Sequence, residues 1–188
     1  MQPQKTPLYD LHVALGGKIV DFAGFLLPVQ YANGILHEHK VVRTAAGLFD
    51  VSHMGAVSLR GENAAAAVRH LVTNRVSTMT DGQCRYALMC YENGTIVDDL
   101  LIYRFAADDY FIVVNAANVE KDFAWMKAHL LPGATITNLS AFYAEIALQG
   151  PKAKDVLAKV ADLSKVPVKN YHFARDIDVG GVTCIVST

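Results

Sequence analysis

A pair of aspartates inside an apolar segment constrains the fold of this chain more than any other feature. Asp98 and Asp99 lie between the apolar residues 96–97 and 100–102, shortly after the dipeptide Asn-Gly at 93–94. Asn-Gly between apolar runs is typical of a two-residue hairpin turn of type I′, in which both central residues have positive φ. The sequence therefore predicts a hairpin whose second strand carries two carboxylates into a buried sheet, where each needs a partner or a task.

The hairpin register predicts which face of the sheet each aspartate occupies. A two-residue turn gives three cross-strand pairs: Cys90 with Val97, Leu88 with Asp99, and Tyr86 with Leu101. Successive side chains of a strand point to opposite faces, so Asp99 shares a face with Tyr86 as a diagonal neighbour about 7–8 Å away, and Asp98 points the other way. The alternatives are that a bulge exchanges the two faces, or that the pair only caps neighbouring backbone.

The composition indicates a folded protein and excludes several classes of function. Of 188 residues, 52% are hydrophobic and 19% charged, and the net charge of −1 offers no basic surface for nucleic acid. Apolar runs such as 111–114 have the length of strands and are too short to cross a membrane, and residues 1–7 lack the features of a signal peptide. Three cysteines without metal-ligand spacing fit a reducing compartment. We therefore expect a cytoplasmic protein that binds neither nucleic acid nor a membrane.

The remaining motifs carry weaker indications of chemistry. His37 and His39 fall on different sides of the helix that is expected over residues 36–46, so no metal site is predicted. The sequence also lacks a glycine-rich phosphate-binding motif. Asp50 and His53 could form an acid–base pair, but Asp50 and Ser52 are also common turn residues. We favour a structural turn that lines a pocket.

The order of elements predicts an α+β fold of the split βαβ, ferredoxin-like type, with a largely antiparallel sheet. Helices are expected over residues 36–46, 62–73 and 116–131, and in a segment that begins at 151. Strands are expected over residues 57–60, 84–90, 95–105, 110–114 and 143–149, and a further strand is expected at Ile136. Residues 1–50 are expected to form an irregular, partly helical segment that packs on an α+β domain over 51–188. Residues 180–188 resemble an apolar strand that stops abruptly, which would leave an unprotected edge. We therefore expect the chain to be a fragment whose domain is incomplete at its C-terminus.

Several stretches resemble one known family, in the same order along the whole chain. The two most specific are Phe-Asp-Val-Ser-His-Met at 49–54 and Gly-Thr-Ile-Val-Asp-Asp-Leu at 94–100. The others cover 6–9, 20–25, 73–74, 113–116 and 148–151. In this combination the chain resembles the N-terminal portion of the glycine cleavage system T proteins, which are tetrahydrofolate-dependent aminomethyltransferases.

The resemblance implies a folate-binding domain and a reaction. T proteins take an aminomethyl group from the lipoyl arm of a carrier (H) protein and pass its carbon to tetrahydrofolate, their co-substrate. Ammonia is released and 5,10-methylenetetrahydrofolate is formed. The family's catalytic aspartate matches Asp99, and Met54, Tyr86 and Asn115 match positions that line its folate pocket.

The chain also departs from the family pattern. Phe25-Leu26-Leu27 stands where the family usually has a tryptophan, an acidic residue and a methionine. The family continues beyond Thr188 with two further domains that hold part of the folate, so we expect that this fragment alone can be inactive. Two alternatives remain open: a non-catalytic folate-binding module, whose Lys-Gly-Cys-Tyr motif is absent here, and a related folate-dependent demethylase.

Overall fold

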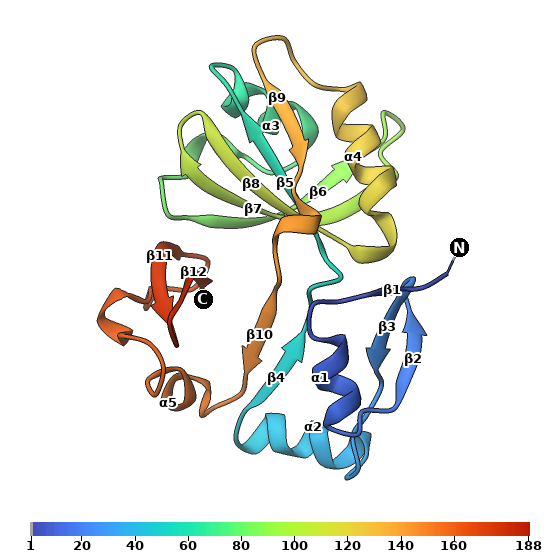
Figure 1. The fold of residues 1–188 in the computed structure, drawn as a ribbon. Coiled ribbons are helices and arrows are strands. Elements are labelled where there is room, and N and C mark those ends of the chain that lie inside the picture. Colours follow the sequence, from blue (N-terminus) through green and yellow to red (C-terminus); the bar gives the residue numbers. More distant parts are fainter. Residues whose placement is uncertain (1) are drawn as a thin grey trace. The chain divides into compact units, whose positions relative to one another are not determined.

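A computed structural model describes residues 2–188, which form two compact units (Figure 1). The first unit contains the chain up to His53 together with Tyr143–Leu163. The second contains Met54–Phe142 and Ser164–Thr188. Each unit is therefore assembled from segments that are distant in sequence.

A five-stranded antiparallel sheet forms the centre of the second unit, in the order β6-β7-β8-β5-β9. Its strands are β5 (Gly55–Arg60), β6 (Cys84–Cys90), β7 (Ile96–Ala106), β8 (Asp109–Val114) and β9 (Thr135–Asn138). The predicted α+β class and antiparallel sheet are confirmed. The ferredoxin-like detail is not confirmed: a split βαβ unit joins parallel strands through its helix, whereas β5 and β6, on either side of α3 along the chain, run antiparallel.

Helices α3 (Ala64–Leu71) and α4 (Val119–Ala128) lie beside this sheet (Figure 1). Short 3₁₀ turns cover Val76–Thr78, Ala116–Asn118 and Ser140–Phe142. The alanine-rich α3 buries Ala64, Ala67, Val68 and Leu71, the i, i+3, i+4, i+7 pattern of one helix face. These residues join Met126 of α4 and side chains of the strands in the main hydrophobic core.

The opposite face of the sheet carries a smaller apolar cluster of Ala56, Phe111 and Val113. Partly buried side chains pack against it, among them Met54 and Leu101. Because side chains two apart in a strand share a face, Asp99 lies on the same face as Leu101. Asp98 lies on the face that packs on the helices.

The turn between β6 and β7 differs from the predicted type I′ turn. Of its residues Asn93 and Gly94, only Gly94 has positive φ, at 84°. The side chain of Asn93 instead accepts hydrogen bonds from the backbone nitrogen of Thr95 at 3.0 Å and from its hydroxyl at 2.7 Å. This local bonding replaces the tight turn, which explains why Asn93 keeps an ordinary φ.

The altered turn changes the register only at the end of the hairpin. The predicted pairing of Cys90 with Val97 is wrong, because the register shifts by one residue and Cys90 faces Ile96. The other two predicted pairs, Leu88 with Asp99 and Tyr86 with Leu101, are confirmed. The bulge therefore ends before the aspartates and does not exchange their faces.

A second hairpin, β11 (Phe173–Val179) and β12 (Val182–Ser187), completes the second unit. Backbone hydrogen bonds attach it to the start of β6: Cys84 donates to Tyr171 at 2.8 Å, and Phe173 donates to Gly82 at 2.8 Å. The ring of Phe173 packs against Tyr103 at a centroid distance of 5.3 Å. The predicted strand near residues 180–188 is thus part of a hairpin that is attached to the start of β6.

In the described part of the first unit, from Gln2 onward, there are two small sheets and three helices. Strands β1 (Gln4–Lys5), β2 (Ile19–Phe22) and β3 (Phe25–Pro28) form one sheet, and β4 (Gly47–Asp50) pairs with β10 (Ile146–Gln149) in the other. The helices are α1 (Tyr9–Ala14), α2 (Ile35–Thr44) and α5 (Ala153–Leu157). A 3₁₀ turn at Leu163–Lys165 marks the point along the chain where the second unit resumes.

Asp50 has a structural role at the end of β4. Its carboxylate accepts hydrogen bonds from the Thr6 hydroxyl at 2.6 Å and the Ser52 backbone nitrogen at 3.0 Å, and it lies 2.9 Å from Nε2 of His12. Burial opposes ionisation, but these hydrogen bonds hold the pKa of Asp50 below its usual value. His53 packs instead against the rings of Phe22 and Phe25, so Asp50 and His53 form no acid–base pair.

Candidate active site

Tyr86 and Asp99 come together on the face of the five-stranded sheet that is opposite α3 and α4, called the open face from here on. Tyr86 lies on β6 opposite Leu101, and Asp99 precedes Leu101 by two residues on β7. The Tyr86 side chain is 48% exposed, so its ring is accessible to a ligand. Partial desolvation, the charge of Asp99 and a hydrogen bond to Asp99 raise the pKa of Tyr86 above its usual value. A phenol and a carboxylate therefore stand side by side on an accessible surface.

Asp98 lies on the buried face of β7 and is bonded on several sides. Its carboxylate accepts hydrogen bonds from Nδ2 of Asn118 at 2.8 Å, from Nδ2 of Asn115 at 3.0 Å and from the backbone nitrogen of Asp99 at 2.9 Å. Burial raises its pKa, but the neighbouring Asp122 carboxyl and these bonds outweigh burial, so that the pKa of Asp98 is lower than usual. Asp98 therefore serves as a buried, ionised acceptor.

Asn115 connects the two aspartates. Its Nδ2 lies 3.0 Å from Oδ1 of Asp98, 3.0 Å from Oδ1 of Asp99 and 3.1 Å from the Asp99 backbone oxygen. Asn115 occupies the N-cap position of the turn at Ala116–Asn118, but its side chain makes no capping hydrogen bond there. One amide group instead fixes the direction of the Asp99 carboxylate relative to the buried Asp98.

Met54 lies just before β5 and packs on the apolar cluster of the open face. Leu101 belongs to the same set of packed side chains and is the partner of Tyr86. The structure thus gathers the four residues singled out in the sequence around one part of the second unit: Met54, Tyr86, Asp99 and Asn115.

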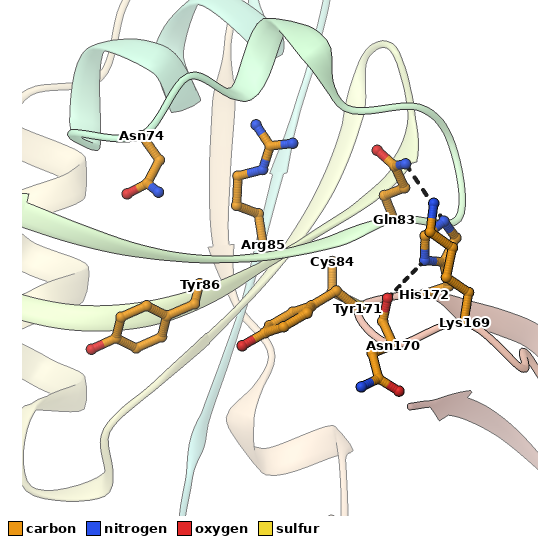
Figure 2. Close-up of a pocket in the computed structure, with 9 residues that line it drawn as sticks. All are labelled: Asn74, Gln83, Cys84, Arg85, Tyr86, Lys169, Asn170, Tyr171 and His172. Atoms are coloured by element: carbon orange, nitrogen blue, oxygen red, sulfur yellow. Dashed lines mark hydrogen bonds between the residues drawn. The ribbon is translucent and has the colours of Figure 1, made fainter.

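A hollow of about 430 Å³ adjoins Tyr86 (Figure 2). It is lined by side chains of the segments around β6 and of the loop before β11: Asn74, Gln83, Cys84, Arg85, Tyr86, Lys169, Asn170, Tyr171 and His172. The rings of Tyr86 and Tyr171 lie on the same side of β6, and Arg85 points to the other side, as alternation along a strand requires (Figure 2). Burial raises the pKa of Cys84 to about 12, so this thiol is a poor nucleophile.

Tyr171 is a residue that sequence reasoning missed. Its φ of 58° is unusual for a bulky residue. Two backbone hydrogen bonds hold this conformation: its carbonyl accepts from Cys84 at 2.8 Å, and its N–H donates to Thr188 at 2.6 Å. Such strained positions cluster at binding sites. Nothing in the local sequence distinguishes Tyr171 from other loop tyrosines, because its place beside Tyr86 depends on long-range pairing.

The described part of the chain contains neither a candidate metal cluster nor a helix that could cross a membrane. Among residues 2–188 the structure brings together no group of three or more His, Cys, Asp or Glu side chains that could hold a metal ion. Within the same residues, no helix combines the length and apolar character needed to cross a membrane. The site itself presents a positioned carboxylate beside a phenol, an amide and apolar side chains.

Comparison with known proteins identifies relatives over nearly the whole chain. Residues 8–188 match the family described as the GCVT N-terminal domain. An aminomethyltransferase of Halalkalibacterium halodurans is 50% identical over 184 residues, and one of Bacillus cereus (strain B4264) is 48% identical. These alignments cover 98% of this chain and 50% of each relative, so the chain spans about half the length of the curated relatives it matches.

Solved structures agree with this relationship. The glycine cleavage system aminomethyltransferase T from Bartonella henselae is 32% identical with a TM-score of 0.83, over 90% of this chain and 46% of that one. The heterotetrameric sarcosine oxidase from Corynebacterium sp. U-96 shares the fold alone, with 15% identity, a TM-score of 0.56 and coverage of 96% of this chain and 78% of that one. The predicted resemblance is confirmed, and the chain belongs to the GCVT N-terminal domain family, the N-terminal portion of glycine cleavage T proteins.

Proposed function

We propose that this chain is the folate-binding part of an aminomethyltransferase of glycine cleavage. The complete enzyme would take an aminomethyl group from the lipoyl arm of a carrier (H) protein and transfer its carbon to tetrahydrofolate. Ammonia and 5,10-methylenetetrahydrofolate would be the products. The aminomethyltransferase activity named for the relatives supports the reaction class, and the cytoplasmic location expected from the cysteines stays a prediction.

The observation that carries the proposal is the placement of Asp99. Its carboxylate is held by the amide of Asn115 at 3.0 Å, on the accessible face of the sheet beside the half-exposed ring of Tyr86. A flat heterocycle can stack on such a ring, and Met54 supplies an apolar contact on the same face. We assign Asp99 as the catalytic residue and Met54, Tyr86 and Asn115 as contacts of the folate site.

The reaction needs no protein nucleophile and no change of oxidation state. The transferred carbon exchanges its bonds to sulfur and to the amine nitrogen for bonds to two folate nitrogens. The two protons displaced from folate end on the sulfur and on the departing ammonia. As the first leaving group departs, positive charge develops near the carbon, where a fixed carboxylate stabilises it.

Asp99 can perform two tasks in this scheme. Its carboxylate faces the side of the sheet on which the substrate would lie, so it can stabilise the developing charge and accept a proton from a folate nitrogen. Asn115 bonds one carboxylate oxygen, and the half-exposed Tyr86 phenol also bonds this carboxylate, so a substrate would meet both groups together. Positioning two large substrates against this group supplies much of the remaining rate enhancement.

The test is the formation of methylenetetrahydrofolate by the complete gene product, supplied with tetrahydrofolate and an aminomethyl-loaded carrier protein. Asp99→Asn is expected to reduce turnover by about 100-fold or more, while tetrahydrofolate affinity changes little. Asp109→Asn is a matched control, since Asp109 lies on β8 of the same sheet and pairs with Arg60 near the surface; it should retain full turnover.

The outcomes separate the proposal from its alternatives. Tetrahydrofolate binding without turnover would favour a non-catalytic folate-binding module and make Asp99 a binding residue only. Turnover with an N-methylated amine in place of the loaded carrier would favour a folate-dependent demethylase. Equal turnover of the wild type and Asp99→Asn would refute the catalytic assignment.

A further inference from the structure

Asp122 is a buried acid for which the proposed reaction has no task. It lies on α4 with no exposed surface, and among residues 2–188 neither carboxylate oxygen has a hydrogen-bond partner. The nearest cation is Lys121, whose Nζ lies 3.6 Å from Oδ1 of Asp122 and is itself bonded to the Val97 carbonyl oxygen at 2.5 Å. A carboxylate left in this state would be costly.

The helix places Asp122 directly behind the candidate active site. Asn118 precedes Asp122 by four residues, and side chains at i and i+4 share one face of a helix. Asn118, the N-cap of α4, donates to Oδ2 of Asp98 at 2.8 Å, and the Asp122 carboxyl, about one turn further along the chain, interacts with the same Asp98 carboxyl. Two carboxyl groups in contact can form a hydrogen bond only when one of them carries a proton.

The surroundings decide which of the two acids carries that proton. Burial, followed by the hydrogen bond and charge of Asp98, raises the pKa of Asp122 to about 7. The amides of Asn115 and Asn118 donate to Asp98 and so favour its ionised form. The proton therefore belongs on Asp122, and the two acids share one negative charge.

We infer that Asp122 is a positioning residue, whose buried carboxyl donates a hydrogen bond to Asp98 and thereby fixes the Asn115 amide that holds Asp99. The interactions connect Asp122 on α4 with Asp98 on the helix-facing side of β7. Through Asn115 they then reach Asp99 on the open face of the sheet. Asp122 touches no substrate in this arrangement. The inference rests on the proposed function for its effect on turnover, but its proton can be detected without it.

The inference predicts opposite behaviour for two substitutions of Asp122. Asp122→Asn keeps a donor that can bond Asp98 at any pH, so its turnover should stay within about threefold of the wild type. Asp122→Leu removes the donor at similar volume, so kcat should fall by about 10-fold or more while KM for tetrahydrofolate changes less than about twofold. Glu120→Gln, an exposed position on the same helix, is the matched control and should be unchanged.

The pH dependence of kcat distinguishes a positioning role of Asp122 from a purely structural one, because the loss of a purely structural residue would leave that dependence unchanged. Loss of the Asp122 proton leaves two facing carboxylates, so wild-type kcat should decline as pH rises through about 7. The charged groups around the pair are Asp99 on β7 and Lys121 on α4, and Lys121 limits the decline but cannot replace the donated bond. In Asp122→Asn this alkaline decline should disappear.

Infrared spectroscopy of the substrate-free complete gene product tests the shared proton separately from catalysis. A carbonyl band of protonated carboxyls is expected at about pH 6; it should lose intensity in Asp122→Asn and disappear when Glu145→Gln, which removes the other acid whose pKa burial raises to about 7, is added. Absence of the band in the wild type, or an equal loss of kcat in the Asn and Leu variants, overturns the inference. If the wild type lacks transferase activity, the band still decides whether Asp122 is protonated, so failure of the proposed function is recognised separately.

Discussion

At the scale of single residues, the amide of Asn115 is the link between a buried and an accessible carboxylate. Its Nδ2 has two hydrogens and three oxygen neighbours within 3.1 Å. Because the same nitrogen bonds Asp98 and Asp99, any movement of the buried aspartate is transmitted to the accessible one. Asn118 bonds only the buried aspartate, and the two asparagines therefore form a matched pair for experiment.

Asn115→Ala and Asn118→Ala should differ in activity more than in stability. Each removes a hydrogen bond to the buried carboxylate of Asp98, which should lower the free energy of unfolding by about 1–3 kcal/mol. Only Asn115→Ala also releases Asp99, so its kcat should fall by about 10-fold or more. The fall in log kcat caused by Asn118→Ala should be less than half of that caused by Asn115→Ala. Urea unfolding and steady-state kinetics of both variants would measure this, and equal kinetic losses would contradict the assigned role of Asn115.

The sequence predicted part of this residue-level geometry. Alternation along β7 and the hairpin register were sufficient to place Tyr86 and Asp99 on one face. The bond from Asn115 was beyond such reasoning, because it depends on the pairing of β7 with β8 and on a side-chain rotamer. Asp122 was missed for the same reason, since a helical acid beside Lys121 resembles an ordinary surface pair.

At the scale of elements, local patterns predicted regular segments better than turns and ends. β6 covers the predicted residues 84–90, and the predicted helix over 62–73 corresponds to α3 at Ala64–Leu71. The predicted helix over 116–131 is shorter, because a 3₁₀ turn occupies Ala116–Asn118 before α4 begins. The type I′ turn was wrong because side-chain bonds of Asn93 compete with backbone geometry. β4 was not recognised, since its partner β10 lies almost a hundred residues away.

Two glycines of the second unit should respond differently to the same substitution. Gly94, in the hairpin turn, has φ of 84° and open space around an added Cβ, so Gly94→Ala should cost only about 1–2 kcal/mol of backbone strain. Gly61, after β5, has φ of 123°, and a Cβ there would lie 2.3 Å from the Gly133 carbonyl oxygen. Gly61→Ala should therefore cost more than about 3 kcal/mol. Urea denaturation would compare the two, and a cost for Gly94→Ala equal to that of Gly61→Ala would show that the Gly133 contact is unimportant.

At the scale of the whole molecule, each unit contains one acid that burial keeps from ionising easily. Asp122 belongs to the second unit and Glu145 to the first, and burial raises the pKa of each to about 7. Asp50 and Asp98 show the opposite behaviour, since hydrogen bonds lower the pKa of each below its usual value. Whether a buried carboxyl is ionised in this protein therefore depends on the donors that surround it and not on burial alone.

These raised values predict that stability falls as pH rises from about 4 to 7. In this window the folded protein binds more protons than the unfolded chain, so the free energy of unfolding declines by up to about 1.4 kcal/mol per pH unit for the fully buried Asp122. Asp50 and Asp98 act only below about pH 4, where their stabilising contribution is lost as pH falls. Asp122→Asn should flatten the decline in the second unit and Glu145→Gln in the first, as followed by urea unfolding with hydrogen exchange of amides in each unit. A slope that persists in the double variant would mean that other groups take up the protons and that neither acid is buried in its neutral form.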